Sequence, residues 1–504
     1  MRSKALLNVK YGVLSQMVKI LLQFIVRKTF IYYLGVELLG VHSLFTSILS
    51  MLAMAELGIG SAVAFSLYKP IVPKKIQTKY RQSCAFYRKL YRIIGIIILT
   101  IGCLLLPFIP DLVSTTSEIP YLRMIFFIIL LKTSLTYLLF AYSQTLLIAA
   151  ECKYEVDKVM VLFNILTSIG ETLIIITTHN FILYLLVEMV CLISQQFLIY
   201  KKAYRRYPEI MSARDVELCK GEKREIWKNV YGLSIGKVSG AMLGSIDSII
   251  LSVFISTTVV GLYSNYLLVQ TAATTIISIV FTSVTANVGR KFADNTISQS
   301  HLYLMFFLNF IICGVCVVMY FALINDFITL FLGNNLLLPF QVVCAFSLNI
   351  FITYMSLSIQ VFKDASGIFW HGKYRPLVTC VLNMLFSLLL VKPLGIAGVV
   401  FATALSRLVT TFWFDPYLVF KYAFNSGLKK YFVTYGYYTA LVLVAVIILH
   451  IIFKTSFFDI VTIPLFICKA VMSFVVIFFT LFIGTMWMEP SRRCVSNLKR
   501  IICK

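Results

Sequence analysis

The sequence predicts an all-α polytopic membrane protein with about fourteen transmembrane helices, and three observations support this. Of its 504 residues 60% are hydrophobic and only 13% are charged, and the mean hydropathy is +0.90. Fourteen apolar segments are each long enough to cross a bilayer, which takes roughly 20 apolar residues in a helix. Lysine and arginine gather in loops on one side of these segments.

The expected crossings are 8–33, 38–68, 91–112, 121–149, 156–177, 180–202, 229–255, 258–288, 302–324, 338–366, 374–392, 395–421, 432–454 and 460–487. Two of them, 38–68 and 258–288, exceed the length of one crossing, so we expect these helices to tilt or to project beyond the bilayer.

The loop charges predict the orientation. The loops 69–92 and 201–228 and the C-terminal tail are rich in Lys and Arg, whereas the loops that face the other side are nearly free of them, with Lys392 and Lys454 as exceptions. Retained basic loops face the cytoplasm, so we expect both termini to be cytoplasmic. The same bias accounts for the net charge of +24, so the charge does not indicate nucleic-acid binding.

The chain repeats itself after the sixth crossing. Asn8-Val9 recurs as Asn229-Val230, and Gly40-Val41-His42-Ser43 aligns with Gly261-Leu262-Tyr263-Ser264, both with an offset of 221 residues. Because six crossings return the chain to the same side, both copies enter the membrane in the same direction, as a parallel repeat. Two bundles rocking about a central cavity form a transporter architecture.

The repeat predicts four parts of the chain. They are an N-terminal lobe (1–207), a basic cytoplasmic linker (208–228), a C-terminal lobe (229–421), and two extra helices with a basic cytoplasmic tail (422–504).

Polar residues within the crossings are the candidate site residues, because an ionisable group in a transmembrane helix usually faces a bundle interior or an aqueous cavity. Gln16, Lys19, Gln23 and Arg27 fall within roughly an 80° arc of the first helix. A lipid-facing helix would not hold such a stripe, although Arg27 could also snorkel to the outer surface. We therefore expect the stripe to line a cavity.

The other cavity candidates are cations in three further crossings: Lys132 in the fourth, Lys237 in the seventh and Arg407 in the twelfth, where an interfacial place for Arg407 is equally open. An excess of cations predicts an anionic substrate, and a diphosphate is the natural partner of Lys and Arg. Asp247, Glu171 and Glu188 are buried acids that could couple transport to an ion. Lys237 and Asp247 share a helix with Gly236, Gly240 and Gly244, a spacing typical of close helix packing.

The sequence has no motif for a metal or a cofactor. The twelve cysteines are scattered, and the CxxC spacing of Cys313 and Cys316 lies within an apolar stretch without a second pair. We find no nucleophile elbow, P-loop or Gly-rich dinucleotide turn, so we expect neither a cofactor nor an enzyme.

Several motifs resemble the bacterial Wzx-type oligosaccharide flippases of the multidrug/oligosaccharidyl-lipid/polysaccharide exporter superfamily. These motifs are Tyr32-Tyr33-Leu34-Gly35, Ala55-Glu56-Leu57-Gly58-Ile59-Gly60, Leu67-Tyr68-Lys69-Pro70, Asp247-Ser248-Ile249-Ile250 and Gly395-Ile396-Ala397-Gly398-Val399. The resemblance implies two six-helix lobes with two extra helices in the bacterial inner membrane. It implies a flippase that moves undecaprenyl-diphosphate-linked oligosaccharide repeat units to the outer leaflet for capsule, O-antigen or exopolysaccharide assembly, alongside glycosyltransferases and a polysaccharide polymerase.

Three alternatives stay open at the level of sequence. A lipid II flippase and a cation-coupled multidrug antiporter belong to the same superfamily, and a membrane-embedded polymerase belongs to the same pathway. A polymerase would be expected to carry a large outer loop, but the longest outer loop, 325–337, is short and apolar.

The last two crossings are almost wholly apolar, with Lys454 and Lys469 as their only charges and Asp459 in the loop between them. We expect them to pack outside the duplicated core and to border a lipid-facing groove for a polyprenyl tail. An equally supported alternative is that they serve only folding or assembly.

Overall fold

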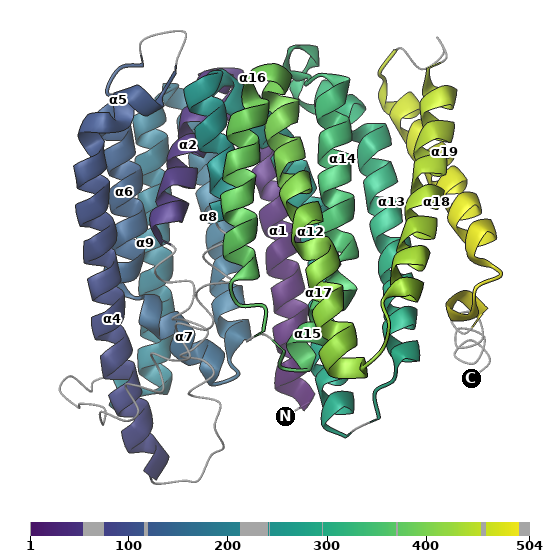
Figure 1. The fold of residues 1–504 in the computed structure, drawn as a ribbon. Coiled ribbons are helices and arrows are strands. Elements are labelled where there is room, and N and C mark those ends of the chain that lie inside the picture. The colour runs from purple at the N-terminus through teal and green to yellow at the C-terminus, as the bar shows by residue number, and fades with distance from the viewer. Residues whose placement is uncertain are drawn as a thin grey trace. The chain divides into compact units, whose positions relative to one another are not determined.

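The computed structural model describes residues 2–53, 75–114, 119–211, 240, 242–294, 296–368, 371–454 and 460–492, to which every structural statement below refers. Nearly all of these residues are helical, and no strand occurs among them. The helices run alongside one another within each part of the chain (Figure 1). The predicted all-α class is confirmed.

The principal helices are α1 (Arg2–Leu34), α2 (Val36–Leu52), α4 (Lys75–Leu105), α6 (Leu122–Leu139), α7 (Ala141–Ala149), α8 (Lys153–Thr178), α9 (Phe181–Arg206), α12 (Thr257–Ala293), α13 (Gln299–Leu332), α14 (Phe340–Met355), α15 (Leu357–Ala365), α16 (Arg375–Val409), α17 (Thr411–Val419), α18 (Lys429–Phe453) and α19 (Ile463–Thr485). Two short helices, α5 (Ile109–Leu112) and α10 (Pro208–Met211), extend the ends of neighbouring elements.

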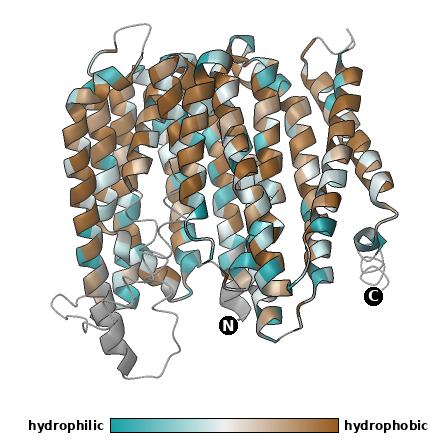
Figure 2. Cartoon of the chain, in the orientation of Figure 1, coloured by the Kyte–Doolittle hydropathy of each residue, from teal (hydrophilic) through white to brown (hydrophobic). Residues whose placement is uncertain are grey.

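Each of the fourteen predicted crossings contains described helical residues, with only 38–53 of the second and 240 and 242–255 of the seventh among the described residues. Nine of the described helices are long and apolar enough to cross a membrane, and one of these nine, Arg375–Phe424, contains two successive crossings. The other four crossings correspond to α1, α2, Met242–Phe254 and α12. Apolar residues dominate the middle of the helices, and polar residues gather at their ends (Figure 2).

The turn between the eleventh and twelfth crossings lies where the sequence places it. Pro393 and Gly395 interrupt α16, and Gly395 has a φ of 57°, a left-handed conformation that costs a glycine little. Three other breaks were not predicted: at Phe140 between α6 and α7, at Ser356 between α14 and α15, and at Thr410 between α16 and α17. None of the three positions is Gly or Pro, which is why hydropathy alone does not reveal them.

The chain forms two compact units, residues 1–261 and 262–504. In the first unit α8 packs against both α1 and α9, and α6 packs against α4 and α9. In the second unit α13 packs against α14, α18 and α19, and α14 also packs against α16. The lobe boundaries predicted from the repeat stay a prediction, since most of the linker lies outside the described residues.

Candidate functional site

A polar cavity of about 580 Å³ lies inside the first unit. Four helices line it, α1, α6, α8 and α9, each through polar side chains. Its lining includes Gln16, Lys19, Gln23, Lys132, Thr136, Asn164, Ser168, Glu171, Glu188 and Gln195. An intramembrane cavity lined by so many polar groups can hold a hydrated or charged ligand.

The α1 stripe supplies one wall of this cavity. Gln16, Lys19 and Gln23 all line it, as their shared helix face requires. Arg27 is not among the lining residues; it is half-buried one turn further along α1 and interacts electrostatically with Tyr184 of α9. The stripe thus faces the cavity over its first three residues and leaves it at Arg27.

An ion pair crosses the cavity wall between α6 and α9. Lys132 Nζ lies 2.8 Å from Glu188 Oε2, with the two side chains 15% and 25% exposed. His42 Nε2 of α2 lies 3.9 Å from the same carboxylate oxygen, which is beyond hydrogen-bond length. Lys132 is therefore a cavity residue whose charge is already matched by an acid of the same unit.

Glu171 of α8 is the second acid of the cavity. It is 7% exposed and lies within electrostatic range of both Glu188 and Lys132. Two lysines and two glutamates line the cavity, so the cation excess predicted from the sequence does not exist within it. Among the described residues, Lys19 is the lining cation with no ion-pair partner.

Aromatic rings surround the carboxylate end of the cavity. Phe30 of α1 meets Phe181 and Tyr184 of α9 edge to face, with ring centroids 5.5 and 5.3 Å apart. The His42 ring lies 6.0 Å from that of Tyr184. Tyr184, which also interacts electrostatically with Arg27, thus belongs to a packed ring cluster beside Glu188.

The remaining predicted residues lie elsewhere. Arg407 of α16 donates through Nη1 to Asn349 Oδ1 of α14 over 3.3 Å, so it joins two helices of the second unit. Asp247 is 4% exposed within Met242–Phe254, and it does not line the cavity. Lys237 lies outside the described residues, as do the motifs at 55–60 and 67–70.

A second cluster of charges was missed by sequence reasoning. Asp415 of α17 is fully buried and lies 3.0 Å from Lys363 Nζ of α15 and 3.0 Å from Arg375 Nη2 of α16. Arg375 also donates to Thr411 Oγ1 over 2.5 Å. An aspartate in the run Phe412-Trp413-Phe414-Asp415 is the signal that could have revealed it.

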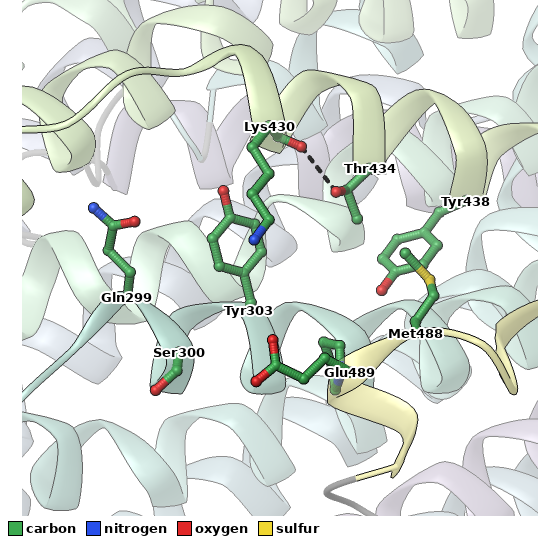
Figure 3. A pocket seen from close by; sticks show the side chains of 9 residues that line it. Gln299, Ser300, Tyr303, Lys430, Thr434, Tyr438, Met488 and Glu489 are labelled. Carbon is green, nitrogen blue, oxygen red and sulfur yellow. Dashed lines mark hydrogen bonds between the residues drawn. The ribbon is translucent and has the colours of Figure 1, made fainter.

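The two last helices pack on α13, and Lys469 of α19 forms an ion pair with Asp326 of α13. A pocket of about 280 Å³ opens beside them, lined by α13, α18 and the segment after α19. Figure 3 shows that Lys430, Tyr303 and Glu489 converge on this pocket. Its polar lining does not suit a polyprenyl chain, so the predicted tail groove stays a prediction.

Among the described residues no group of three or more His, Cys, Asp or Glu side chains could hold a metal ion.

Solved transporters share this fold. The lipid II flippase MurJ, in an inward closed conformation, is similar over 95% of this chain and 99% of its own, with a TM-score of 0.70 and 15% identity. An inward-facing multidrug resistance MATE family transporter of the MOP superfamily is similar over 78% and 91% of the two chains, with a TM-score of 0.60 and 14% identity. A MOP superfamily transporter from Pyrococcus furiosus reaches a TM-score of 0.56 at 14% identity over 82% and 96%.

No protein-family model matches the sequence, and no curated protein matches it. At 14–15% identity the structural likenesses concern the fold alone. The chain is a multi-pass membrane protein with the fold shared by MurJ and the MATE transporters of the MOP superfamily.

Proposed function

We propose that this protein is a non-enzymatic flippase for undecaprenyl-diphosphate-linked oligosaccharide repeat units, acting in the bacterial inner membrane. The observation that carries the proposal is the polar cavity of the first unit, where Lys19 has no acidic partner among the described residues. The MurJ-like fold and the Wzx-type motifs support the same substrate class. In this mechanism the sugar-diphosphate head enters the polar interior while the polyprenyl tail stays in lipid.

Lys19 and Arg27 have different roles in the proposal. Lys19 can offer its ammonium group directly to a phosphate, because it lines the cavity without an ion-pair partner there. Arg27 lies one turn further along α1 and does not line the cavity, so in this proposal it meets the diphosphate at a second point, outside the lining described above. A guanidinium binds phosphate through two parallel hydrogen bonds, so Arg27→Lys replaces it only in part.

Flipping of a fluorescent polyprenyl-diphosphate oligosaccharide in proteoliposomes tests the proposal. Lys19→Ala and Arg27→Ala should each lose flipping while inserting at normal levels. Lys10→Ala is the matched control, because Lys10 is exposed on the same helix and does not line the cavity. Full activity of both Lys19→Ala and Arg27→Ala would contradict the assignment.

A lipid II flippase is the second candidate, favoured by the TM-score of 0.70 to MurJ. Both substrates carry a diphosphate on a polyprenol, so the cavity residues alone do not separate them. A competition experiment separates the two substrates. In the proposal, the protein should still flip the labelled oligosaccharide lipid in the presence of excess lipid II. Complete inhibition by lipid II would favour the second candidate.

We further propose that an acid in the membrane couples transport to an ion. Glu171 is the stronger candidate than Glu188, because the carboxylate of Glu188 already has Lys132 at 2.8 Å. Asp247 is the third candidate, from a separate helix. Flipping driven by a proton or sodium gradient should lose its gradient dependence in Glu171→Gln and keep it in Asp247→Asn; the reverse pattern would transfer the role to Asp247.

The proposed orientation places both termini and the 201–228 loop in the cytoplasm. Impermeant thiol labelling of intact cells, with the native cysteines removed, tests it. An Arg214→Cys variant should be labelled only after permeabilisation. Labelling without permeabilisation would reverse the topology.

A further inference from the structure

A groove of about 360 Å³ runs along the second unit where α16 meets α17. The two helices separate at Thr410, whose φ of −117° and ψ of −75° interrupt the helix. At that break the hydroxyls of Thr379 and Thr410 lie 2.7 Å apart and join the first half of α16 to the start of α17. The break therefore separates the two helices beside the groove, and the hydroxyl contact holds them together at that point.

The walls of the groove are apolar. Val378, Val409 and Trp413 line it and are each about half exposed, at 48%, 46% and 49%. The polar edge of Trp413 is already satisfied, since its Nε1 donates to Val409 O over 2.6 Å. A half-exposed apolar wall on membrane-spanning helices suits a hydrocarbon chain.

The mouth of the groove is basic. His371 and Arg375 line it, and Lys373 lies next to it, with Nζ 4.8 Å from the centre of the Tyr374 ring. His371 stacks on Tyr422, which follows the exposed Lys421. Around this mouth Lys363, Lys373, Arg375 and Lys421 outnumber Asp364 and Asp415 by two charges.

The two aspartates do not neutralise all the positive charge at the mouth of the groove. Asp415 is fully buried behind it and holds Arg375 in place, at 3.0 Å, rather than facing the groove. Asp364 lies within electrostatic range of Lys363 and Arg375. On the outer side Lys373 lies over the Tyr374 ring, Lys421 lies over the Tyr417 ring, and the His371 ring stacks on Tyr422.

We propose that this groove binds an anionic phospholipid, with one acyl chain along Val378 and Trp413 and the phosphate at His371 and Lys373. The charge of the mouth selects the headgroup: a zwitterionic lipid brings its own cation, whereas an anionic one complements the excess of basic residues. The inference is independent of the transported substrate, and it holds whether or not the proposed flippase activity is correct.

Native mass spectrometry of the purified full-length protein tests the proposal with two lipids of identical acyl chains, phosphatidylglycerol and phosphatidylethanolamine. Phosphatidylglycerol should be retained in preference. The variant His371→Gln/Lys373→Gln should weaken its binding by about fivefold or more, because Lys373→Gln removes one charge and His371→Gln removes the ring at the mouth. The exposed Lys429 gives the matched control, because Lys429→Gln removes a charge near the same end of the neighbouring α18 and should have no effect.

Val378→Trp tests the acyl part, since a larger ring fills the groove and should displace the lipid with the basic mouth intact. Equal retention of both lipids would overturn the proposal. So would binding that survives both the double variant and Val378→Trp. Displacement by undecaprenyl diphosphate at lower concentration than by phosphatidylglycerol would also overturn it, because the groove would then be an entry site for substrate. If Val378→Trp fails to fold, the surface variant His371→Gln/Lys373→Gln still decides the matter.

Discussion

Gly40 of α2 and Gly261 of α12 lie backbone against backbone. A Cβ added to Gly40 would lie 3.1 Å from Gly261 N, and one added to Gly261 would lie 3.3 Å from Gly40 N. The two glycines hold the same position in the two copies of the repeat identified in the sequence. This backbone contact thus joins two residues that the repeat relates to each other.

This contact predicts that neither glycine can be replaced by alanine. The new methyl group would come within 1.9 Å of Thr257 O in Gly40→Ala and within 2.3 Å of Val36 O in Gly261→Ala. Backbone atoms cannot turn aside as a side chain can, so each variant should lose about 1–3 kcal/mol or more of folding free energy. Thermal unfolding in detergent measures the loss.

The control is Gly436→Ala in α18, where a Cβ would have no other heavy atom within 4 Å. This variant should melt at or slightly above the wild-type temperature, since alanine favours a helix. Wild-type stability of Gly40→Ala would show that the two helices can separate at no cost.

The spacing of Gly236, Gly240 and Gly244 would let another backbone approach the seventh crossing closely. Among the described atoms nothing lies within 4 Å of a Cβ at Gly240 or Gly244, and Gly236 lies outside the described residues. Spacing identifies a face that permits close approach, but only the packing of the helices decides whether a partner uses it.

Hydropathy and helix periodicity were sufficient to predict the positions of the crossings, the turn at Gly395 and the cavity-facing stripe of α1 as far as Gln23. Each of these depends on residues near one another in the chain. The pair of Lys132 and Glu188 could not be predicted, because it depends on which faces of α6 and α9 meet. The position of His42 beside Glu188 depends in the same way on how α2 is placed against α9.

The Lys132–Glu188 pair predicts a non-additive effect on stability. Lys132→Met should lower the free energy of unfolding by about 3 kcal/mol, because it leaves Glu188 without a counter-ion beside Glu171. The double variant Lys132→Met/Glu188→Leu should recover most of that loss. A double-mutant cycle of unfolding temperatures measures the coupling.

Lys19→Met serves as the control for this cycle, since Lys19 lines the same cavity without an ion-pair partner among the described residues. Its effect on stability should be small. If the effects of the two single variants simply add in the double variant, the pair contributes no coupling and the two side chains act independently.

Replacing Asp415 should lower the stability of the protein more than replacing either of its partners, Lys363 or Arg375. Asp415→Asn leaves two cations facing each other in a buried place, whereas Lys363→Met or Arg375→Met leaves one intact pair. Asp364→Asn is the matched control, because Asp364 is the exposed aspartate next to Lys363. Unfolding temperatures should fall most in Asp415→Asn and least in Asp364→Asn; a fall in Asp364→Asn as large as that in Asp415→Asn would refute the buried cluster.

The last prediction concerns α18 and α19, for which the sequence left a tail groove and a folding role equally open. The Tyr438 ring of α18 stacks on Phe310 of α13 with centroids 3.9 Å apart, and Lys469 of α19 pairs with Asp326 of α13. Removing the two helices would expose these α13 residues and leave Asp326 within a membrane-spanning helix without its counter-ion. We therefore expect truncation after residue 428 to lower the amount of protein in the membrane.

Membrane level and flipping must be measured separately, and a second variant separates folding from transport. Truncation combined with Asp326→Asn should recover part of the lost protein, because the uncompensated charge has been removed. Normal level with lost flipping would instead support a groove for the polyprenyl tail. Normal level with normal flipping would exclude both roles, because α13 would then need neither helix to fold nor to carry substrate.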